Sequence, residues 1–358
     1  MNSLICTECK KSFPLHEPIW RCACGGMLDI TYNSTFPIEK IKHRPQNMWR
    51  YREALPIERK PISYQEGYTP LLPFDYDGKR LFVKQEHLFQ TGSFKDRGAA
   101  LLVNKIAQLG IKEVVEDSSG NAGAAVAAYC ARAGIKAEIF VSQYAAQTKI
   151  RQIKSYGAKL ISIDGNREKV ADAALKQAHK IYYASHVWNP FFLHGVKTSA
   201  FEICEQLGWG NPNTILVPVG NGSLLLGLFL GFSELQKDGI ISKLPRLIAV
   251  QAKNCSPIYD SFHHLPPGPK KKTIANGASV RHPVRTKQIL DAISTTNGNV
   301  LRVEESEITK ALFRLWRKGF LVEPTTALTF AALDQYETKE NEKIVTFFTG
   351  HGLKSLNC

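Results

Sequence analysis

One lysine stands where the chain could carry out covalent chemistry. Residues 81–86 are predicted as a strand, residues 91–93 as a polar turn, and residues 99–109 as an apolar-periodic helix. Lys95 falls in the first turn of this helix, where the positive end of the helix dipole disfavours an ammonium group. The same field favours the neutral amine, which can attack a carbonyl carbon. Taken alone, the stretch is explained equally well by a surface ion pair between Lys95 and Asp96.

Three more polar turns follow predicted strands. The first is Ser118-Ser119-Gly120-Asn121, the second is Gly220-Asn221-Gly222-Ser223-Leu224, and the third is Thr349-Gly350-His351-Gly352. A turn between a strand and a helix presents backbone N–H groups that can bind an anion or the polar edge of a ligand. The second turn is also compared with a dinucleotide-binding fingerprint, which requires a further glycine where Leu225 stands.

Four cysteines form a compact set near the amino terminus. Cys6-x-x-Cys9 is followed by Cys22-x-Cys24, with two glycines directly behind. Four thiolates on two short turns can close a tetrahedral site, and this arrangement predicts a structural zinc ion. Free or partly oxidised thiols remain an alternative, because the second pair has one spacer residue where two are usual.

Composition limits the class of protein. The chain has 358 residues, of which 44% are hydrophobic and 22% charged, so it can bury the core of a globular protein with two domains. The net charge of +14 suits anionic partners, but the basic residues are spread along the chain, so we expect a phosphorylated small molecule and not nucleic acid. The apolar residues 214–232 are interrupted by Pro218 and the turn after it, so we expect no membrane span. Without a signal peptide in the amino-terminal residues, we expect a cytoplasmic protein.

Strand and helix patterns alternate from Glu66 onward, which predicts an α/β fold with two open, twisted, mainly parallel sheets flanked by helices. Residues 1–34 are predicted as a small cysteine-rich, zinc-ribbon-like element. We place residues 35–80 and 190–358 in a larger α/β domain, and residues 81–189 in a smaller one. A break is expected at Asn189-Pro190, followed by a helix at residues 197–207. The polar turns are expected at the carboxyl ends of the strands, where two facing sheets would form a cleft.

The motifs, taken in order, resemble the pyridoxal-phosphate enzymes of fold type II, the tryptophan synthase β-like class, and within it the threonine synthase family. The resemblance covers residues 66–353. It rests on the Lys95 motif, the three polar turns, and four shorter stretches: Glu66-Gly67-Tyr68-Thr69-Pro70-Leu71, Asn189-Pro190, Gly195 with Lys197-Thr198, and Glu323-Pro324-Thr325-Thr326-Ala327. The resemblance implies a pyridoxal 5'-phosphate-dependent lyase that converts O-phosphohomoserine and water to threonine and phosphate, and the habit of the family implies a homodimer.

The resemblance also implies roles for individual residues. Lys95 would hold the cofactor as a Schiff base and move the proton at the substrate α-carbon. Asn121 would bind the phenolic oxygen of the cofactor, and Thr349 would meet its pyridine nitrogen. The cofactor phosphate would lie on the larger domain, at Gly220, Asn221, Gly222, Ser223 and Leu224. The substrate would be held by Ser118, Ser119, Asn121 and Lys197, and zinc by Cys6, Cys9, Cys22 and Cys24.

One departure bears on the substrate. After Asn189-Pro190, Phe192 stands where the family commonly has an arginine that binds the substrate phosphate. Losing a guanidinium removes a bidentate phosphate contact, so a different substrate stays open. The alternatives are a β-replacing enzyme acting on O-phosphoserine, as in cysteate synthase, and a threonine or serine dehydratase-like lyase. A non-catalytic protein that binds partners through its zinc knuckle is the alternative from another class.

Overall fold

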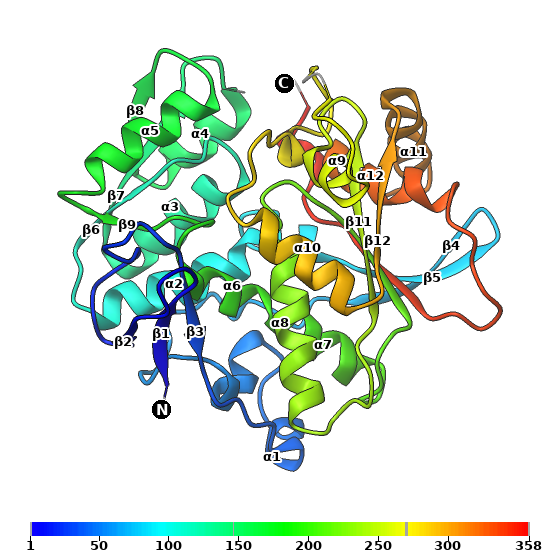
Figure 1. The fold of residues 1–358 in the computed structure, drawn as a ribbon, viewed down its shortest axis with the longest axis horizontal. Helices are drawn as coiled ribbons and strands as arrows, with labels where there is room; N and C mark the ends of the chain where they lie inside the picture. The colour runs from blue at the N-terminus through cyan, green and yellow to red at the C-terminus, as the bar shows by residue number, and fades with distance from the viewer. Residues whose placement is uncertain (1, 146, 269–270, 357–358) are drawn as a thin grey trace. The chain divides into compact units, whose positions relative to one another are not determined.

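The computed structural model describes residues 2–145, 147–268 and 271–356 (Figure 1). Contacts between residues divide the chain into two compact units. Among the described residues, unit 1 holds 2–67 and 95–196, and unit 2 holds 68–94 and 197–356. No helix in the described ranges is both long and apolar enough to cross a membrane.

Unit 1 begins with a small antiparallel sheet that carries the cysteines. Its central strand β1 (Ser3–Cys6) lies between β2 (Ser12–Pro14) and β3 (Leu28–Thr31). Trp20, in the loop that follows β2, packs edge-on against the ring of Tyr183 with 5.1 Å between centroids. This contact attaches the cysteine-bearing element to the strand β9 of the second sheet in the same unit.

The second sheet of unit 1 is parallel, with strand order β8-β7-β6-β9. The middle of β7 is buried along five consecutive residues, as expected for a parallel strand covered on both faces. The α-helices α3 and α5 both pack against β7. The strands are β6 (Glu113–Glu116), β7 (Lys136–Ser142), β8 (Lys159–Ile163) and β9 (Tyr182–Tyr183).

Among the helices of unit 1, α2 and α6 approach each other closely because glycines line their contact. A Cβ atom on Gly98 would lie 2.3 Å from the ring of Phe192, and one on Gly195 would lie 2.1 Å from the carbonyl oxygen of Arg97. The α-helices are α1 (Ile38–Lys42), α2 (Lys95–Gln108), α3 (Asn121–Ala133), α4 (Gln147–Ser155), α5 (Arg167–Gln177) and α6 (Pro190–Val196), and η1 (Met48–Ala54) is a 3-10 helix.

Unit 2 is built on a six-stranded sheet with strand order β12-β11-β10-β13-β5-β4. Only the pairing of β4 with β5 is antiparallel among these neighbours. The last strand of the chain, β13, lies between β10 and β5. The strands are β4 (Leu71–Tyr76), β5 (Lys79–Lys84), β10 (Thr214–Pro218), β11 (Arg246–Ala252), β12 (Asn299–Val303) and β13 (Ile344–Phe347).

Helix α12 is buried at eight of its ten residues, and it packs on β10, β11 and β12. A buried ion pair with both side chains 0% exposed joins Lys84 on β5 to Glu202 on α7 at 2.7 Å. The helices are α7 (Thr198–Gln206), α8 (Ser223–Lys237), α9 (Pro257–Phe262), α10 (Thr286–Thr295), α11 (Glu305–Arg317) and α12 (Pro324–Leu333), with 3-10 turns η2 (Glu86–Leu88), η3 (Asn276–Ala278) and η4 (Gly352–Lys354).

The predicted α/β class is confirmed, while two local expectations differ from the structure. We expected a break at Asn189-Pro190, but helix α6 begins there. The Asn189 side chain accepts a hydrogen bond from the Phe191 backbone N–H at 3.2 Å, and proline suits the first turn of a helix. The predicted helix 197–207 accordingly becomes a second helix, α7, that starts at Thr198.

The contact-based units differ from the predicted domains in three places, one of which is residues 190–196, the segment of helix α6, which belong to unit 1. Residues 81–94 belong to unit 2, because β5 is hydrogen-bonded to β13 within the larger sheet. Residues 35–67 belong to unit 1, where the Asn104 side chain of α2 bonds both the N–H and the carbonyl of Ile62, at 2.7 and 2.8 Å.

Candidate functional site

The turn before Lys95 is held by the polar turn near the end of the chain. Within unit 2, the backbone N–H of Phe94 donates to the carbonyl of Thr349 at 3.1 Å, and the N–H of His351 donates to the carbonyl of Gly92 at 2.9 Å. The structure therefore brings together two motifs that lie far apart in the sequence. These bonds fix the backbone of residues 92–94, the turn that precedes Lys95 in the sequence.

Lys95 opens helix α2 of unit 1 and is half-buried. Its Nζ lies 5.5 Å from the centre of the Phe192 ring, which is itself fully buried on α6. Gly98 leaves the space that the ring occupies, since any larger residue there would overlap it. A cation–π contact of this kind stabilises the Lys95 ammonium. The apolar surface of the ring also excludes water, which would stabilise the ammonium more strongly.

The Ser118-Ser119-Gly120-Asn121 turn lies in the same unit as Lys95, between β6 and α3. The Ser118 hydroxyl accepts a hydrogen bond from the Gly120 N–H at 3.2 Å. A Cβ atom on Gly123 would lie 1.8 Å from the Ser118 carbonyl oxygen, so the turn folds directly onto the first turn of α3. Gly120, the N-cap of α3, supplies no capping side chain, which leaves this position suited to a carboxylate oxygen from a ligand.

The sequence did not point to Glu116 and His186, which lie beside this turn. Glu116 ends β6, and its Oε1 lies 2.6 Å from the Nδ1 of His186, with both side chains buried. Burial raises the pKa of Glu116 to about 8 and places the pKa of His186 well below its ordinary value. Residues 70 positions apart meet only because β9 pairs with β6, so no local pattern could have found them.

In unit 2, the Gly220-Asn221-Gly222-Ser223-Leu224 turn connects β10 to the 15-residue helix α8. Gly222 is the N-cap of α8 and has a φ of 78°, a left-handed conformation that favours glycine. A Cβ atom there would also lie 2.4 Å from the side chain of Ile289. The first N–H groups of α8 have no partner within the helix, so this turn is suited to an anion such as phosphate.

Thr349 follows β13 and is hydrogen-bonded to Thr326 on α12. The Thr326 hydroxyl oxygen accepts from the Thr349 N–H at 3.0 Å, and the two hydroxyl oxygens are also 3.0 Å apart. If Thr326 donates its proton to Thr349, the Thr349 hydroxyl keeps its own proton for another acceptor. An unprotonated ring nitrogen is such an acceptor.

Lys197 immediately precedes α7 and is fully buried. Its Nζ lies 2.7 Å from Glu234 Oε1 on α8, and burial lowers the pKa of Lys197 while this carboxylate opposes the shift. The ion pair joins α7 to α8. Its assignment as a substrate ligand stays a prediction.

The four cysteines meet at the small sheet of unit 1. Cys6 Sγ lies 3.5 Å from Cys24 Sγ, and Cys9 Sγ lies 3.6 Å from Cys22 Sγ. A disulfide needs about 2.05 Å between sulfurs, whereas four thiolates about 2.3 Å from a zinc ion are separated by roughly 3.8 Å. The Gly26 N–H donates to Cys24 Sγ at 3.4 Å, which helps to lower the pKa of that thiol. The cluster fits a tetrahedral metal ion.

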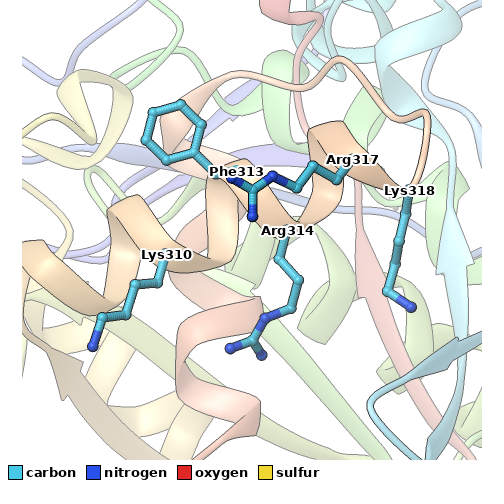
Figure 2. Close-up of a pocket in the computed structure, with 5 residues that line it drawn as sticks. All are labelled: Lys310, Phe313, Arg314, Arg317 and Lys318. Carbon is cyan, nitrogen blue, oxygen red and sulfur yellow. The ribbon is translucent and has the colours of Figure 1, made fainter.

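Two open hollows in unit 2 contain none of the predicted site residues. One, of about 450 Å³, lies along α11 and is lined by Lys310, Phe313, Arg314, Arg317 and Lys318 (Figure 2). The other, of about 620 Å³, includes Thr214 and Arg246, the first residues of β10 and β11. Ligands of open α/β sheets bind at the carboxyl ends of strands, so this second hollow is at the wrong end for that role.

Each unit, taken by itself, carries groups that suit pyridoxal phosphate. Unit 1 supplies the Lys95 amine and the turn at residues 118–121. Unit 2 supplies a glycine-bearing turn at a helix N-terminus and a threonine hydroxyl whose partner is fixed. An amine, an anion-binding turn and a hydroxyl for the ring nitrogen are the contacts that the aldehyde, phosphate and pyridine of this cofactor require.

Comparison with known proteins gives the same answer. Residues 62–350 match the family model described as pyridoxal-phosphate dependent enzyme. The threonine synthase of Methanocaldococcus jannaschii is 38% identical over 98% of this chain and 92% of its own, and that of Methanosarcina acetivorans is 35% identical over 99% and 92%. Among solved structures, maize serine racemase superposes with a TM-score of 0.70 at 25% identity, covering 80% of this chain and 88% of that one.

The family model covers well over half of the chain, and the named relatives are aligned along nearly all of it. The predicted fold type II architecture and the predicted cofactor, pyridoxal 5'-phosphate, are thereby confirmed. The chain belongs to the pyridoxal-phosphate dependent enzyme family and is a lyase of the threonine synthase-like group.

Proposed function

We propose that this lyase converts O-phosphohomoserine and water to threonine and phosphate. The observation that carries the proposal is the similarity to threonine synthases along almost the whole chain, at 38% identity in one relative and 33% in another over a shorter span. The basic character of the chain, with a net charge of +14, is in keeping with a phosphorylated substrate.

Pyridoxal phosphate, when bound, supplies an aldehyde that joins an amine covalently and a ring that accepts negative charge from the substrate carbon. In this proposal, Lys95 holds the aldehyde carbon and moves the proton at the substrate α-carbon. The turn at residues 220–224 binds the cofactor phosphate through backbone N–H groups. Thr349 donates its hydroxyl to the ring nitrogen, with Thr326 as the partner that orients it.

The substrate would be held mainly by unit 1. Ser118, Ser119 and Asn121 bind its carboxylate at the uncapped start of α3, where backbone N–H groups favour a negative charge. Asn121 also binds the phenolic oxygen of the cofactor. Lys197 is proposed as a further substrate contact, in competition with its ion pair to Glu234.

A second candidate function comes from one observation. The buried ring of Phe192 fills the position where the resemblance leads us to expect a phosphate-binding arginine. A β-replacement on O-phosphoserine, or the dehydration of threonine or serine, involves a different substrate, for which an arginine at this position is not expected. Structures with a comparable fold include a threonine deaminase, with a TM-score of 0.68 at 26% identity.

The test is to incubate the purified chain, loaded with pyridoxal phosphate, with O-phosphohomoserine and to measure threonine and phosphate together. We expect equal amounts of both, and neither with Lys95→Ala. Phosphate without threonine, or a 2-oxo acid formed from threonine or serine, would contradict the proposal and favour the second candidate. Borohydride reduction followed by peptide mapping should locate the reduced cofactor on Lys95.

We also propose a structural zinc ion on Cys6, Cys9, Cys22 and Cys24, supported by the sulfur distances. We propose a homodimer as well, because the family that the chain resembles commonly forms homodimers. Metal analysis of the purified protein and its mass in solution test these two points separately from the activity.

A further inference from the structure

A group of titratable side chains in unit 1 that the proposed function does not use surrounds Glu116. Glu116 is 0% exposed, Asp117 follows it, and His186 reaches them from the segment after β9. One donor atom from each of the three residues lies within 4.8 Å of the others. Glu116 Oε2 and Asp117 Oδ1 are both buried without a hydrogen-bond partner. Each of these oxygens needs a proton, a cation or a water molecule.

The pair is close to the proposed catalytic lysine. The ring of His186 packs edge-on against the ring of Phe192 with 6.0 Å between centroids, and the Lys95 Nζ lies 5.5 Å from the centre of the same ring. All these residues belong to unit 1. The lysine and the pair therefore share one buried aromatic neighbour, with little room for water to screen the charges.

Charged and titratable groups face Glu116 from every side. Lys95 on α2 and Arg167 at the start of α5 are the cations, and each counteracts the effect of burial on Glu116. Asp117 and the phenol of Tyr183 lie on the sheet side, and the thiol of Cys130 lies on α3. The two cations work against a divalent metal ion at this point, because they repel it.

Burying a charged carboxylate in this environment costs free energy, so we describe Glu116 and His186 as a pair that holds a proton. With 2.6 Å between Glu116 Oε1 and His186 Nδ1, the proton on the carboxylic acid is donated to a neutral imidazole. Burial acts in this direction on both partners, raising the pKa of Glu116 to about 8 and lowering that of His186. Near neutral pH the pair then carries no net charge.

We propose that Glu116 and His186 are positioning residues that set the charge state of Lys95 by holding a proton beside it. While Glu116 keeps the proton, it adds no negative charge that would stabilise the Lys95 ammonium, and the amine is more available for the aldehyde. When Glu116 loses the proton at higher pH, its negative charge holds Lys95 as an ammonium and slows that reaction. This inference rests on the role proposed for Lys95.

The experiment measures the reactivity of Lys95 in the full chain after removal of the cofactor with hydroxylamine. Reductive methylation with limiting formaldehyde is followed at pH 6 to 10 by peptide mass spectrometry, with the exposed Lys112 as the internal reference. The proteins are the parent, Glu116→Gln and His186→Leu. The matched control is Glu138→Gln, which removes a carboxyl on the neighbouring strand that pairs with Lys159.

Below about pH 7 we expect the Lys95 to Lys112 ratio of all four proteins to agree within twofold. Above pH 8, Glu116→Gln should react at least threefold faster than the parent, because it cannot become negative. His186→Leu should move in the same direction, since a Glu116 carboxylate beside leucine would lose its imidazole partner and would form only at higher pH, and Glu138→Gln should follow the parent. Equal effects of Glu116→Gln at every pH would indicate a purely structural role and overturn the proposal.

Two further outcomes keep this proposal separate from the proposed function. Titration of the full chain with Mn²⁺ should show no binding that depends on Glu116, and such binding would replace the proton by a metal ion and overturn the inference. If borohydride fixes pyridoxal phosphate on Lys95 but the pH profiles of parent and Glu116→Gln coincide, only the role of the pair fails. If no adduct forms on Lys95, the proposed function fails first.

Discussion

The hydroxyl oxygen of Thr326 lies 3.0 Å from both the backbone nitrogen and the hydroxyl oxygen of Thr349. The two hydroxyls share one hydrogen bond, and when Thr326 is the donor in it, the Thr349 hydroxyl keeps its own proton for another acceptor. Thr326 thus determines whether Thr349 acts as a donor or as an acceptor, although only Thr349 stood out in the sequence as a cofactor ligand.

Replacing Thr326 by valine should therefore weaken the binding of pyridoxal phosphate about tenfold, in line with the loss of one oriented hydrogen bond. Equilibrium dialysis or cofactor absorbance measures the change. Thr329→Val is the matched control, because Thr329 is equally buried on α12 and its hydroxyl bonds Thr346 at 2.8 Å and the backbone carbonyl of Thr326, which leaves the Thr326 hydroxyl in place. Equal loss of affinity in both variants would contradict this role for Thr326.

Gly98→Ala should destabilise the protein by about 1–3 kcal/mol, because the new methyl group overlaps the ring of Phe192. Phe192→Leu should cost a similar amount on its own, through the space it leaves. In the double variant the smaller side chain makes room for the methyl group. We therefore expect its loss of unfolding free energy to be smaller than the sum of the losses of the two single variants. Urea unfolding of the four proteins measures this, and strict additivity would show that the two residues are not in contact.

Removing the metal proposed at the four cysteines should loosen the attachment of the small sheet to β9. Trp20 lies between the cysteine turns and packs on Tyr183 and Trp188, so its fluorescence reports on that contact. We expect a strong chelator, or Cys22→Ser, to remove one zinc ion per chain and to change the tryptophan emission. Cys130→Ala, which alters a buried cysteine outside the cluster, should keep both. An unchanged emission spectrum after zinc loss would argue against this attachment.

Glu116 should make the stability depend on pH in a predictable direction. Its pKa is raised to about 8 in the folded protein, so the folded state holds a proton that the unfolded state releases near its ordinary value of 4.5. This contribution is fully present below pH 4.5 and is lost as the pH rises through about 8. His186 is retained in Glu116→Gln, so the titration of its imidazole in the unfolded state, near the ordinary pKa of 6.5, contributes to both proteins.

Between pH 6.5 and 8, the parent should therefore lose about 1.5 kcal/mol more stability than Glu116→Gln, since the slope is at most 1.36 kcal/mol per pH unit for one proton and falls to half of that at pH 8. Unfolding in urea at several pH values gives both curves. Parallel curves would mean that Glu116 is already ionised in the folded protein.

The ion pair of Lys197 with Glu234 separates a structural role from a substrate contact. Lys197→Met should cost about 3 kcal/mol, because a mostly buried carboxylate loses its partner, and Lys197→Met with Glu234→Leu should recover most of it. Activity of the double variant on O-phosphohomoserine then decides the role. A stable but inactive double variant supports the substrate contact, and a stable, active one removes it.

Much of the fold could be predicted because polar turns, glycines and apolar periods are local properties. Helix α6 could not, since all its residues are buried and show no period, and its proline looks like a break. Strand β4 contains Pro73, which argues against a strand, yet β4 is at the edge of its sheet, where a missing N–H is tolerated.

The site followed the same division. Lys95 and the polar turns stand out by type and spacing. The partners that orient them do not, because Glu116 and His186 are brought together by pairing of β6 with β9, and Thr326 and Thr349 by packing of α12 beneath the larger sheet. The sequence contains these residues but carries no mark of their proximity.

The position of β13 affects how the chain can fold during synthesis. This strand, residues 344–347, is made long after β5 and β10, yet it forms hydrogen bonds with β10 on one side and β5 on the other. Until it leaves the ribosome, both neighbours expose open edges to which other strands can pair. Until β13 has been made, the nascent larger sheet is therefore incomplete and prone to aggregation, because the place between β10 and β5 is empty.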